Sequence, residues 1–264
     1  MTGAQPIGPW ELALASSFLL VAAGLSLALS LGLVQDLLVA AGRTYIQLLA
    51  LGFVLRWVFG AASPWLVVGI LALMVVVATH TALSRVRHRP PGLFLSGLGA
   101  LVLTGITVTL AVTGLIIRVE PWYLPRYVIP LGGMVIGNAM NGVAVSLERL
   151  FHDLSSRETE ILALLALGAT PWEAVRPSAR TAVRSGLIPT INSMSAAGIV
   201  FIPGMMTGQV LSGTDPRIAA AYQIVVLLMI AAATAGASIL AVVTGYRRVF
   251  DDEARFVGGE PPPG

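Results

Sequence analysis

The stretch WVFGAASPWLVVGILALMVVVATHTALS, residues Trp57–Ser84, contains no Asp, Glu, Lys or Arg. About 20 consecutive apolar residues let a helix cross the roughly 30 Å hydrocarbon core of a bilayer, so this stretch predicts a membrane span. The sequence therefore predicts an all-α integral membrane protein. Five further uncharged runs of at least 21 residues predict similar spans: Leu12–Val34, Pro90–Ile117, Tyr127–Leu147, Ser185–Thr214 and Ile218–Tyr246.

The composition supports the same class. Only 11% of the 264 residues are charged and 56% are hydrophobic, whereas soluble domains carry about 25% charged residues. All 16 basic residues are arginine, so the chain lacks the Gly-Lys-Ser/Thr motif of phosphate-binding loops. Cysteine is also absent, which excludes disulfides and thiolate metal sites. The arginines are dispersed without interleaved aromatic residues, so we expect no nucleic acid partner.

A seventh span is harder to recognise. Thr44–Phe59 is bounded by Arg43 and interrupted by Arg56, and it spans only if Arg56 snorkels from near a helix end. The alternative is an amphipathic helix on the membrane surface. Arginines cluster after alternate spans, as the positive-inside rule predicts for cytoplasmic segments, which favours about seven helices with the N-terminus outside and the C-terminus cytoplasmic. The clusters are Arg85, Arg87 and Arg89, then Arg149, Arg157, Arg176, Arg180 and Arg184, and finally Arg247, Arg248 and Arg255.

The chain reads as one domain without a soluble module. Residues 1–250 predict a polytopic transmembrane domain of a multi-pass protein in the cytoplasmic membrane. Its longest hydrophilic part is a cytoplasmic segment at residues 148–184. Residues 251–264, with three consecutive prolines, predict a flexible cytoplasmic tail.

Segment 148–184 predicts two short helices joined at a glycine, the first capped by Ser155 or Ser156. Acidic residues in the first turn suit the helix dipole, glycine at C′ ends a helix, and a Thr-Pro-x-Glu start satisfies the amides of the next helix. Such a charged pair is typical of a docking element. The alternative is an interfacial pair that its arginines hold on anionic lipid. The residues in this pattern are Glu158, Glu160, Gly168, Thr170, Pro171 and Glu173.

Two similar patterns lie inside the predicted spans Tyr127–Leu147 and Ser185–Thr214. IPLGGMVIGN (residues 129–138) and IPGMMTGQ (residues 202–209) each contain an Ile-Pro pair, a GxxxG spacing and a carboxamide, and Pro203 predicts a break or kink. GxxxG spacing lets backbones approach closely, and the amide can hydrogen-bond across the contact. One interpretation is simple packing with methionine filling gaps. The other is a central path where sulfur and amide oxygens touch a softer cation. The candidate path residues are Met134, Asn138, Asn141, Met205, Met206 and Gln209.

No acidic residue falls in the middle of a span. Proton and ion relays use intramembrane acids and histidines, so this absence argues against an ion-coupled secondary carrier. A transporter of this kind needs an ATPase subunit to drive it. A membrane scaffold that moves no substrate is the other alternative.

Three long motifs resemble the FetB-like family of iron-export ABC transporter permeases, which includes plant permeases linked to aluminium tolerance. The resemblance extends from about residue 41 to residue 250. The motifs are PWYLPRYVIPLGGMVIGNAMNGVAVSLERL (Pro121–Leu150), LALGATPWEA (Leu165–Ala174) and LIPTINSMSAAGIVFIPGMMTGQVLSG (Leu187–Gly213).

This resemblance implies a homodimeric permease in membrane lipid that docks two copies of a cytosolic FetA-like ABC ATPase. It implies no cofactor on this chain, with ATP and magnesium on the partner. Residues 158–173 would then form the coupling element, whose turn includes Gly168 and Ala169. Iron export follows from the resemblance alone, since another cation or a sugar nucleotide would leave the same hydropathy profile.

Overall fold

The computed structural model describes residues 7–61, 63–87, 89–251, 253, 255 and 256, which contain helices and no strand. Five helices begin with proline at their first position, where the missing N–H is not needed and the fixed φ suits the helix. The helices are α1 (Pro9–Ala28), α2 (Val34–Ala61), α3 (Pro64–Ser84), α4 (Leu93–Ala111) with a π turn η1 (Val112–Ile116), α5 (Pro125–Ser156), α6 (Glu158–Ala166), α7 (Pro171–Ala196), α8 (Gly204–Leu211), α9 (Pro216–Gly245) and a short 3-10 helix η2 (Tyr246–Val249).

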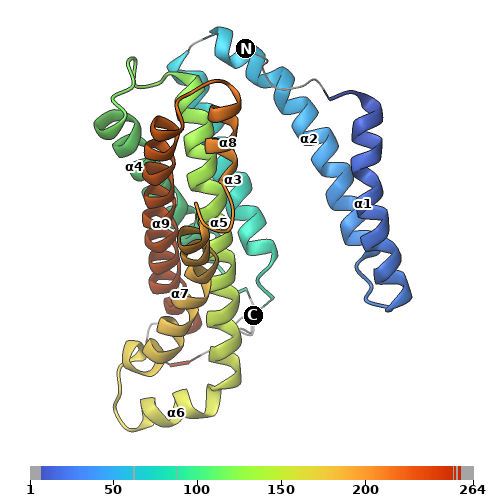
Figure 1. Ribbon diagram of the computed structural model, residues 1–264. Coiled ribbons are helices and arrows are strands. Elements are labelled where there is room, and N and C mark those ends of the chain that lie inside the picture. The colour runs from blue at the N-terminus through green and yellow to red at the C-terminus, as the bar shows by residue number, and fades with distance from the viewer. Residues whose placement is uncertain (1–6, 62, 88, 252, 254, 257–264) are drawn as a thin grey trace.

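Helix α5 is the centre of a bundle formed with α3, α4, α7 and α9 (Figure 1). The largest buried cluster lies where these helices meet. Two of its members on α5, Leu147 and Leu150, are fully buried. Helix α6 lies beyond one end of α5, and α8 lies toward the opposite end of the bundle.

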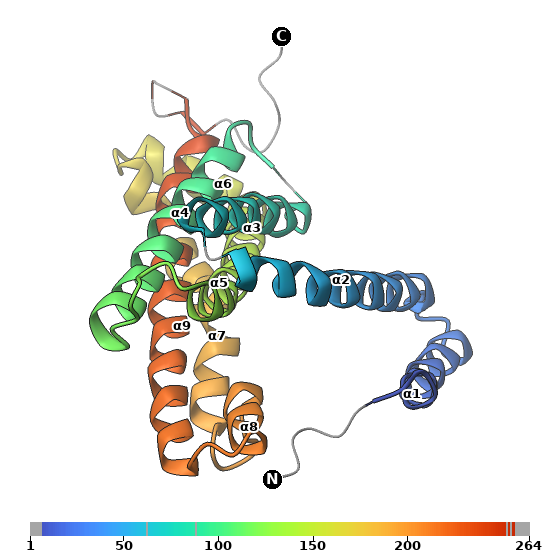
Figure 2. The ribbon, with the colours of Figure 1, turned by 90° about the horizontal axis from the view of Figure 1, so that it is seen from above.

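Helices α1 and α2 extend away from this bundle. Figure 2 shows α2 leading outward from the bundle with α1 at its far side. The hydroxyls of Ser16 on α1 and Tyr45 on α2 hydrogen-bond at 2.6 Å. The end of α2 joins the bundle at a small cluster that includes Val58, Val67 and Val128.

Three predicted boundaries in this region are wrong. The predicted span Trp57–Ser84 is not one helix, because Trp57–Ala61 form the end of α2 and α3 begins at Pro64. The first span ends at Ala28 rather than Val34, because Ser30 and Gly32 take positive φ and turn the chain. The marginal segment Thr44–Phe59 is part of the single helix α2, so Arg43 lies inside a helix instead of bounding it. Arg56 is near the end of that helix, where a long side chain can reach an interface.

The predicted span Ser185–Thr214 is interrupted before Gly204, as Pro203 predicts, but its predicted start is wrong. Helix α7 already begins at Pro171 and ends at Ala196, and α8 begins only at Gly204. Gly198 has φ +81°, and its N–H donates to the carbonyl of Phe201 in a tight turn. Pro203 then precedes the first residue of α8, as the predicted break requires.

Six described helices are long and apolar enough to cross a membrane: α1, α2, α3, α4 with η1, α5, and α9 with η2. The arginine-rich segments gather at one end of the bundle. There the backbone N–H of Arg87 donates to Glu148, and the Arg248 guanidinium lies over Gly92. This grouping is the one that the charge pattern predicts. The membrane orientation stays a prediction.

Of the predicted flexible tail, residues 252, 254 and 257–264 lie outside the described residues. The described part begins with a turn in which Asp251 and Arg255 hydrogen-bond through their backbones at 3.0 Å. The ring of Phe256 then packs on that of Phe250.

Candidate functional site

The break between α7 and α8 brings the two predicted polar motifs together. Met134 on α5 and Met205 on α8 pack against one buried cluster formed by α5, α9 and the η1 turn. With Gln209 they line an outer cavity of about 380 Å³, which also includes Arg126 and Tyr222.

One atom of this outer cavity lacks a partner. Gln209 Oε1 is buried without a hydrogen bond to any of the described residues. A buried acceptor left in this way is costly unless water or a ligand satisfies it. Met206, half-buried on the same helix, does not line this cavity.

A middle cavity of about 270 Å³ follows along α5. Asn138 and Asn141 line it together with Thr190 and Ser193 of α7 and Gly204 of α8. The two carboxamides are exposed in the protomer. Carboxamides are poor neighbours for lipid tails, so this face needs a polar covering in the membrane.

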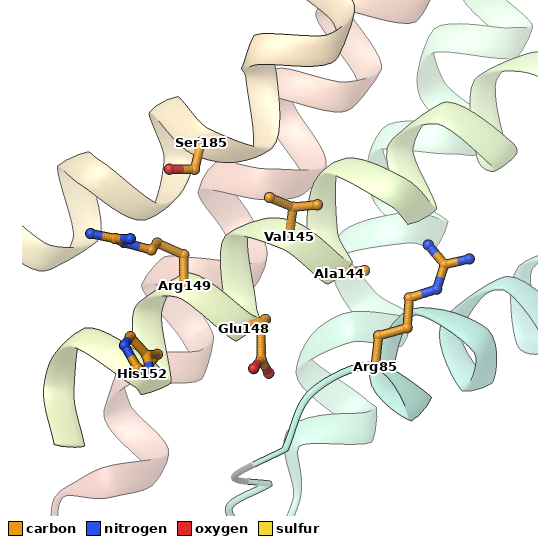
Figure 3. A pocket seen from close by; sticks show the side chains of 7 residues that line it. All are labelled: Arg85, Ala144, Val145, Glu148, Arg149, His152 and Ser185. Carbon is orange, nitrogen blue, oxygen red and sulfur yellow. The ribbon is translucent and has the colours of Figure 1, made fainter. Parts of the chain in front are cut away.

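An inner cavity of about 440 Å³ lies at the arginine-rich end, between α3, α5 and α7 (Figure 3). It is lined by Glu148 and His152, one turn apart on α5, with Arg149 of the same helix and Ser185 of α7. Arg85 at the end of α3 is the remaining charged lining residue, and its guanidinium donates to Asn141 Oδ1 at 3.3 Å.

The three cavities follow one another along α5. The outer one is lined by α5 residues 126–134, the middle one by 138–145 and the inner one by 144–152. Val145 lines both the middle and the inner cavity, so these two adjoin. Five of the six predicted path residues therefore lie along one row, and Met206 is the exception.

Of the four GxxxG glycines, only Gly133 makes a close helix contact within the described protomer, since an added Cβ there would lie 3.1 Å from Met74 Cε of α3. A side-chain carbon at Gly137, Gly204 or Gly208 would meet no atom within 4 Å. The Asn138 amide donates to the carbonyl of Met134 on its own helix at 2.8 Å, not across a helix contact. These three glycine positions face open space.

The close backbone approach occurs elsewhere, between α5 and α7. A Cβ atom at Gly186 would lie 2.5 Å from the Gly142 carbonyl oxygen and closer still to Ser146 Oγ. A Cβ atom at Gly142 would lie 2.5 Å from Thr234 Cγ2 of α9. Two glycines from different helices thus make the α5–α7–α9 crossing possible.

Sequence reasoning missed the charged residues of the inner cavity. Glu148 and His152 have the i, i+4 spacing that places two side chains on one helix face, so their proximity could have been predicted from the sequence. The contribution of Arg85 could not have been predicted, because it depends on how α3 packs. Among the described residues, no group of three or more His, Cys, Asp or Glu side chains is placed to hold a metal ion. The cavity thus offers a cation few ligands from one protomer.

The predicted helix joint at Gly168 in segment 148–184 is confirmed, but only α6 is short, because α7 continues from Pro171 to Ala196. Gly168 has φ +92°, and the amides of Gly168 and Ala169 donate to the carbonyls of Leu165 and Leu164 in a Schellman motif. Thr170 caps α7, which starts at Pro171, and forms the predicted capping box with Glu173. The first cap was mispredicted, because α6 starts after Arg157 without a side-chain cap.

Arg157 ties the two helices of this segment together. Its guanidinium donates to both carboxylate oxygens of Glu160 on α6, at 2.8 and 2.5 Å, and to the buried hydroxyl of Ser178 on α7 at 2.7 Å. The hydrogen bond with Glu160 raises the pKa of Arg157, and the same bond lowers the pKa of Glu160. Hydrogen bonds from the backbone and hydroxyl of Thr170 likewise lower the pKa of Glu173. Glu158 is exposed in the first turn of α6.

Comparison with known proteins places this arrangement in a family. The model of an uncharacterised protein family, UPF0014, matches residues 9–250. The chain belongs to the UPF0014 family. No solved structure matches it.

Relatives within UPF0014 come from bacteria and plants. The UPF0014 membrane protein slr1647 of Synechocystis is 39% identical over 86% of this chain and 88% of its own length. ALUMINUM SENSITIVE 3 of Arabidopsis thaliana is 37% identical over 81% of this chain and 78% of its own. The "Probable iron export permease protein FetB" of Escherichia coli is 34% identical over 94% of both chains. The protein is therefore a UPF0014 membrane protein with a permease homologue.

Proposed function

We propose that this protein is the membrane-spanning subunit of an ABC transporter that exports a metal cation, iron in the first instance, across the cytoplasmic membrane. A separate ATPase subunit hydrolyses the ATP. The observation that carries the proposal is the row of three cavities along α5, from Met134 to His152. A row of hollows that each contain polar side chains, within a membrane helix bundle, is the arrangement expected of a path for cargo.

The exposed side of this row favours a homodimer. Asn138 and Asn141 are exposed on α5. An added Cβ at Gly137 of α5, or at Gly204 or Gly208 of α8, would meet no atom within 4 Å. A second copy of the chain would cover the carboxamides with its own and close the path between two protomers. In this arrangement the α7–break–α8 element supplies a seventh crossing, with the N-terminus outside.

The α6–α7 turn supports docking of the ATPase at the arginine-rich end. Leu167, at the tip of the turn that follows α6, is 86% exposed. An exposed apolar knob on a rigid, charged hairpin suits a protein groove. In the proposed mechanism, closure of the ATPase dimer pushes α6, Arg157 passes the movement to α7, and α5 and α8 repack around the path.

Cargo identity rests on chemistry and on relatives. Glu148 and His152 would contact a cation at the inner mouth of the path. Beyond them, the path is lined by side-chain amides and methionine sulfur atoms. Such ligands suit softer or borderline cations, and weak binding favours passage. Among the described residues that line the outer and middle cavities none is acidic, which disfavours an ion-coupled carrier. The name of the E. coli relative points to iron.

The decisive experiment reconstitutes the full chain with its ATPase in proteoliposomes and measures ATP hydrolysis and metal flux against Fe²⁺ concentration. We expect Fe²⁺ to stimulate hydrolysis and the double variant Asn138→Leu/Asn141→Leu to lose that stimulation. Asn192→Leu is the matched control, since this exposed asparagine on α7 lines none of the three cavities. Flux along an ion gradient without the ATPase would identify a secondary carrier, and a complex with no flux would identify a scaffold.

The cysteine-free sequence permits a direct test of the dimer. Asn138→Cys introduces the only thiol in each chain, and a short bismaleimide should link two copies. Leu73→Cys, on an exposed part of α3, should stay unlinked. Equal linking of both variants would contradict the proposed interface.

A further inference from the structure

A hollow between α4 and α9 lies outside the row of cavities along α5. It measures about 530 Å³ and is formed by the first turns of α4 and the last turns of α9. This size is within the range of ligand sites, about 300–1,000 Å³. Its α4 side carries Leu95 and Leu103, which are 66% and 60% exposed.

The walls of this groove are mostly apolar, with Ser96 and Thr244 as their polar residues. Leu240 of α9 faces the α4 leucines across it. The hydroxyl of Thr244, the polar wall residue of α9, donates to its own helix at the carbonyl of Leu240, 2.7 Å away, so it offers no free proton to the groove. The floor is open at Gly99, where an added Cβ would meet no atom within 4 Å.

Two arginines stand at one end of the groove. Arg247 and Arg248 follow α9, are exposed, and line the same hollow. Gly92, with φ +77°, lets the chain pass under Arg248, because an added Cβ would lie 2.8 Å from its Nη1 atom. The loop before α4 thus holds one guanidinium over the mouth of the groove.

Neither arginine forms an ion pair among the described residues. The nearby acids that the structure describes are engaged elsewhere: Glu253 pairs with Arg255, and Asp251 accepts backbone N–H bonds within its own turn. Among the described residues, two positive charges therefore stand at the end of the groove, at the level where the apolar part of α9 ends.

We infer that this α4–α9 groove binds an anionic phospholipid. An acyl chain lies along the leucines and over Gly99, and the headgroup phosphate is held by Arg247 and Arg248. Basic pockets between membrane helices at the cytoplasmic side recognise such headgroups. The aliphatic walls suit an acyl chain and the two neighbouring positive charges suit a phosphate headgroup. The exposed carboxamides of α5, by contrast, suit contact with another protein surface.

Native mass spectrometry of the purified full chain tests the inference with two lipids of identical acyl chains, phosphatidylglycerol and phosphatidylcholine. We expect one phosphatidylglycerol to be retained preferentially. Arg247→Gln/Arg248→Gln should weaken its binding about tenfold or more, since each arginine near the headgroup contributes about a factor of five. The matched control, Arg176→Gln/Arg180→Gln, removes two exposed charges from α7 and should change little.

A second variant keeps the test sharp. Gly99→Leu fills the groove into open space without a clash and should remove the tight site for both lipids. Equal affinity for the two lipids, or equal weakening by both arginine pairs, would overturn the inference. So would unchanged binding in Gly99→Leu, or a shift of that variant from dimer to monomer, which would make the groove a protein interface. Displacement of the lipid by glycerol phosphate alone would also overturn it.

Discussion

Helices α2 and α5 have nearly the same mean hydropathy and opposite environments. In the most apolar 18-residue window of α2 no residue is buried, whereas 56% of the corresponding window of α5 is buried. In water the more apolar helix would be the more buried one, because burial of apolar side chains is favourable there. In a bilayer the lipid tails are as apolar as leucine, so hydropathy does not decide which helix forms the core.

Small residues mark the core helix. Helix α5 meets its neighbours at glycines, Gly132 against Leu71 of α3 and Gly142 against Thr234 of α9, while Gly52 and Gly60 of α2 face open space. Close packing of backbones provides the van der Waals contact that drives association of helices in membranes. The two regions should therefore respond very differently to added or removed volume.

The largest effect is expected at the α5–α7 crossing. Gly186→Leu forces a side chain into the Gly142 carbonyl and should destabilise the bundle by at least about 3 kcal/mol. Gly52→Leu on α2 adds the same atoms to open space and should leave the melting temperature in lipid nanodiscs unchanged. Equal thermal stability of the two variants would mean that this crossing is not close-packed.

Shortening a leucine side chain tests the same difference between α5 and α2. Leu147 on α5 is fully buried, while Leu49 on α2 is 60% exposed. We expect Leu147→Ala to cost about 3 kcal/mol through lost contacts and a cavity, and Leu49→Ala to stay within about 0.5 kcal/mol. Thermal unfolding of both variants in the same nanodiscs measures the difference. A comparable loss at Leu49 would show that α2 is packed against a partner in the assembled protein.

The sequence predicted the spans well for α4 and α9, whereas the uncharged run Trp57–Ser84 joined the end of α2 to α3, which begins at Pro64. It predicted the α6–α7 turn because Gly168, Thr170 and Glu173 act through local backbone bonds that depend on neighbours in the sequence. Fold class and capping are short-range or compositional properties, so one chain is enough to read them.

The errors have a common physical origin. Hydropathy treats the run Ser185–Thr214 as uniform, although Gly198 and Pro203 end one helix and start another. Arg43 was taken as the boundary of a span although it lies inside α2. The sequence alone does not distinguish an arginine that snorkels from within a helix from an arginine in a loop. The pairing of Gly142 with Gly186, like the hydrogen bond from Arg85 to Asn141, depends on helix packing and left no periodic signal in the sequence.

A third prediction concerns the hairpin outside the bundle. Arg157→Gln removes the bonds to Glu160 and Ser178 that join α6 to α7. We expect faster amide hydrogen exchange in α6 and a fall in metal flux per ATP hydrolysed, with the bundle intact. Arg180→Gln, which removes an exposed charge from α7, is the control for hydrogen exchange. Unchanged exchange in the Arg157 variant would show that α6 holds its place without this link.

The smallest effect is expected at the start of α7, where one carboxylate rather than packing fixes the helix. Glu173 accepts hydrogen bonds from the N–H and hydroxyl of Thr170, at 2.8 and 2.7 Å, and these bonds lower its pKa. Because the folded pKa lies below the unfolded one, the stabilisation is complete above the ordinary glutamate value and is lost as pH falls through the folded pKa.

Protection of the first α7 amides against hydrogen exchange, corrected for intrinsic rates, should therefore decrease on acidification in the wild type. Glu173→Gln should show the weaker protection at neutral pH already and no further change. Amides of α2, remote from this carboxylate, report any general loosening of the protein. If they lose protection in parallel with α7, acid acts on the whole fold and the capping box is not the titrating element.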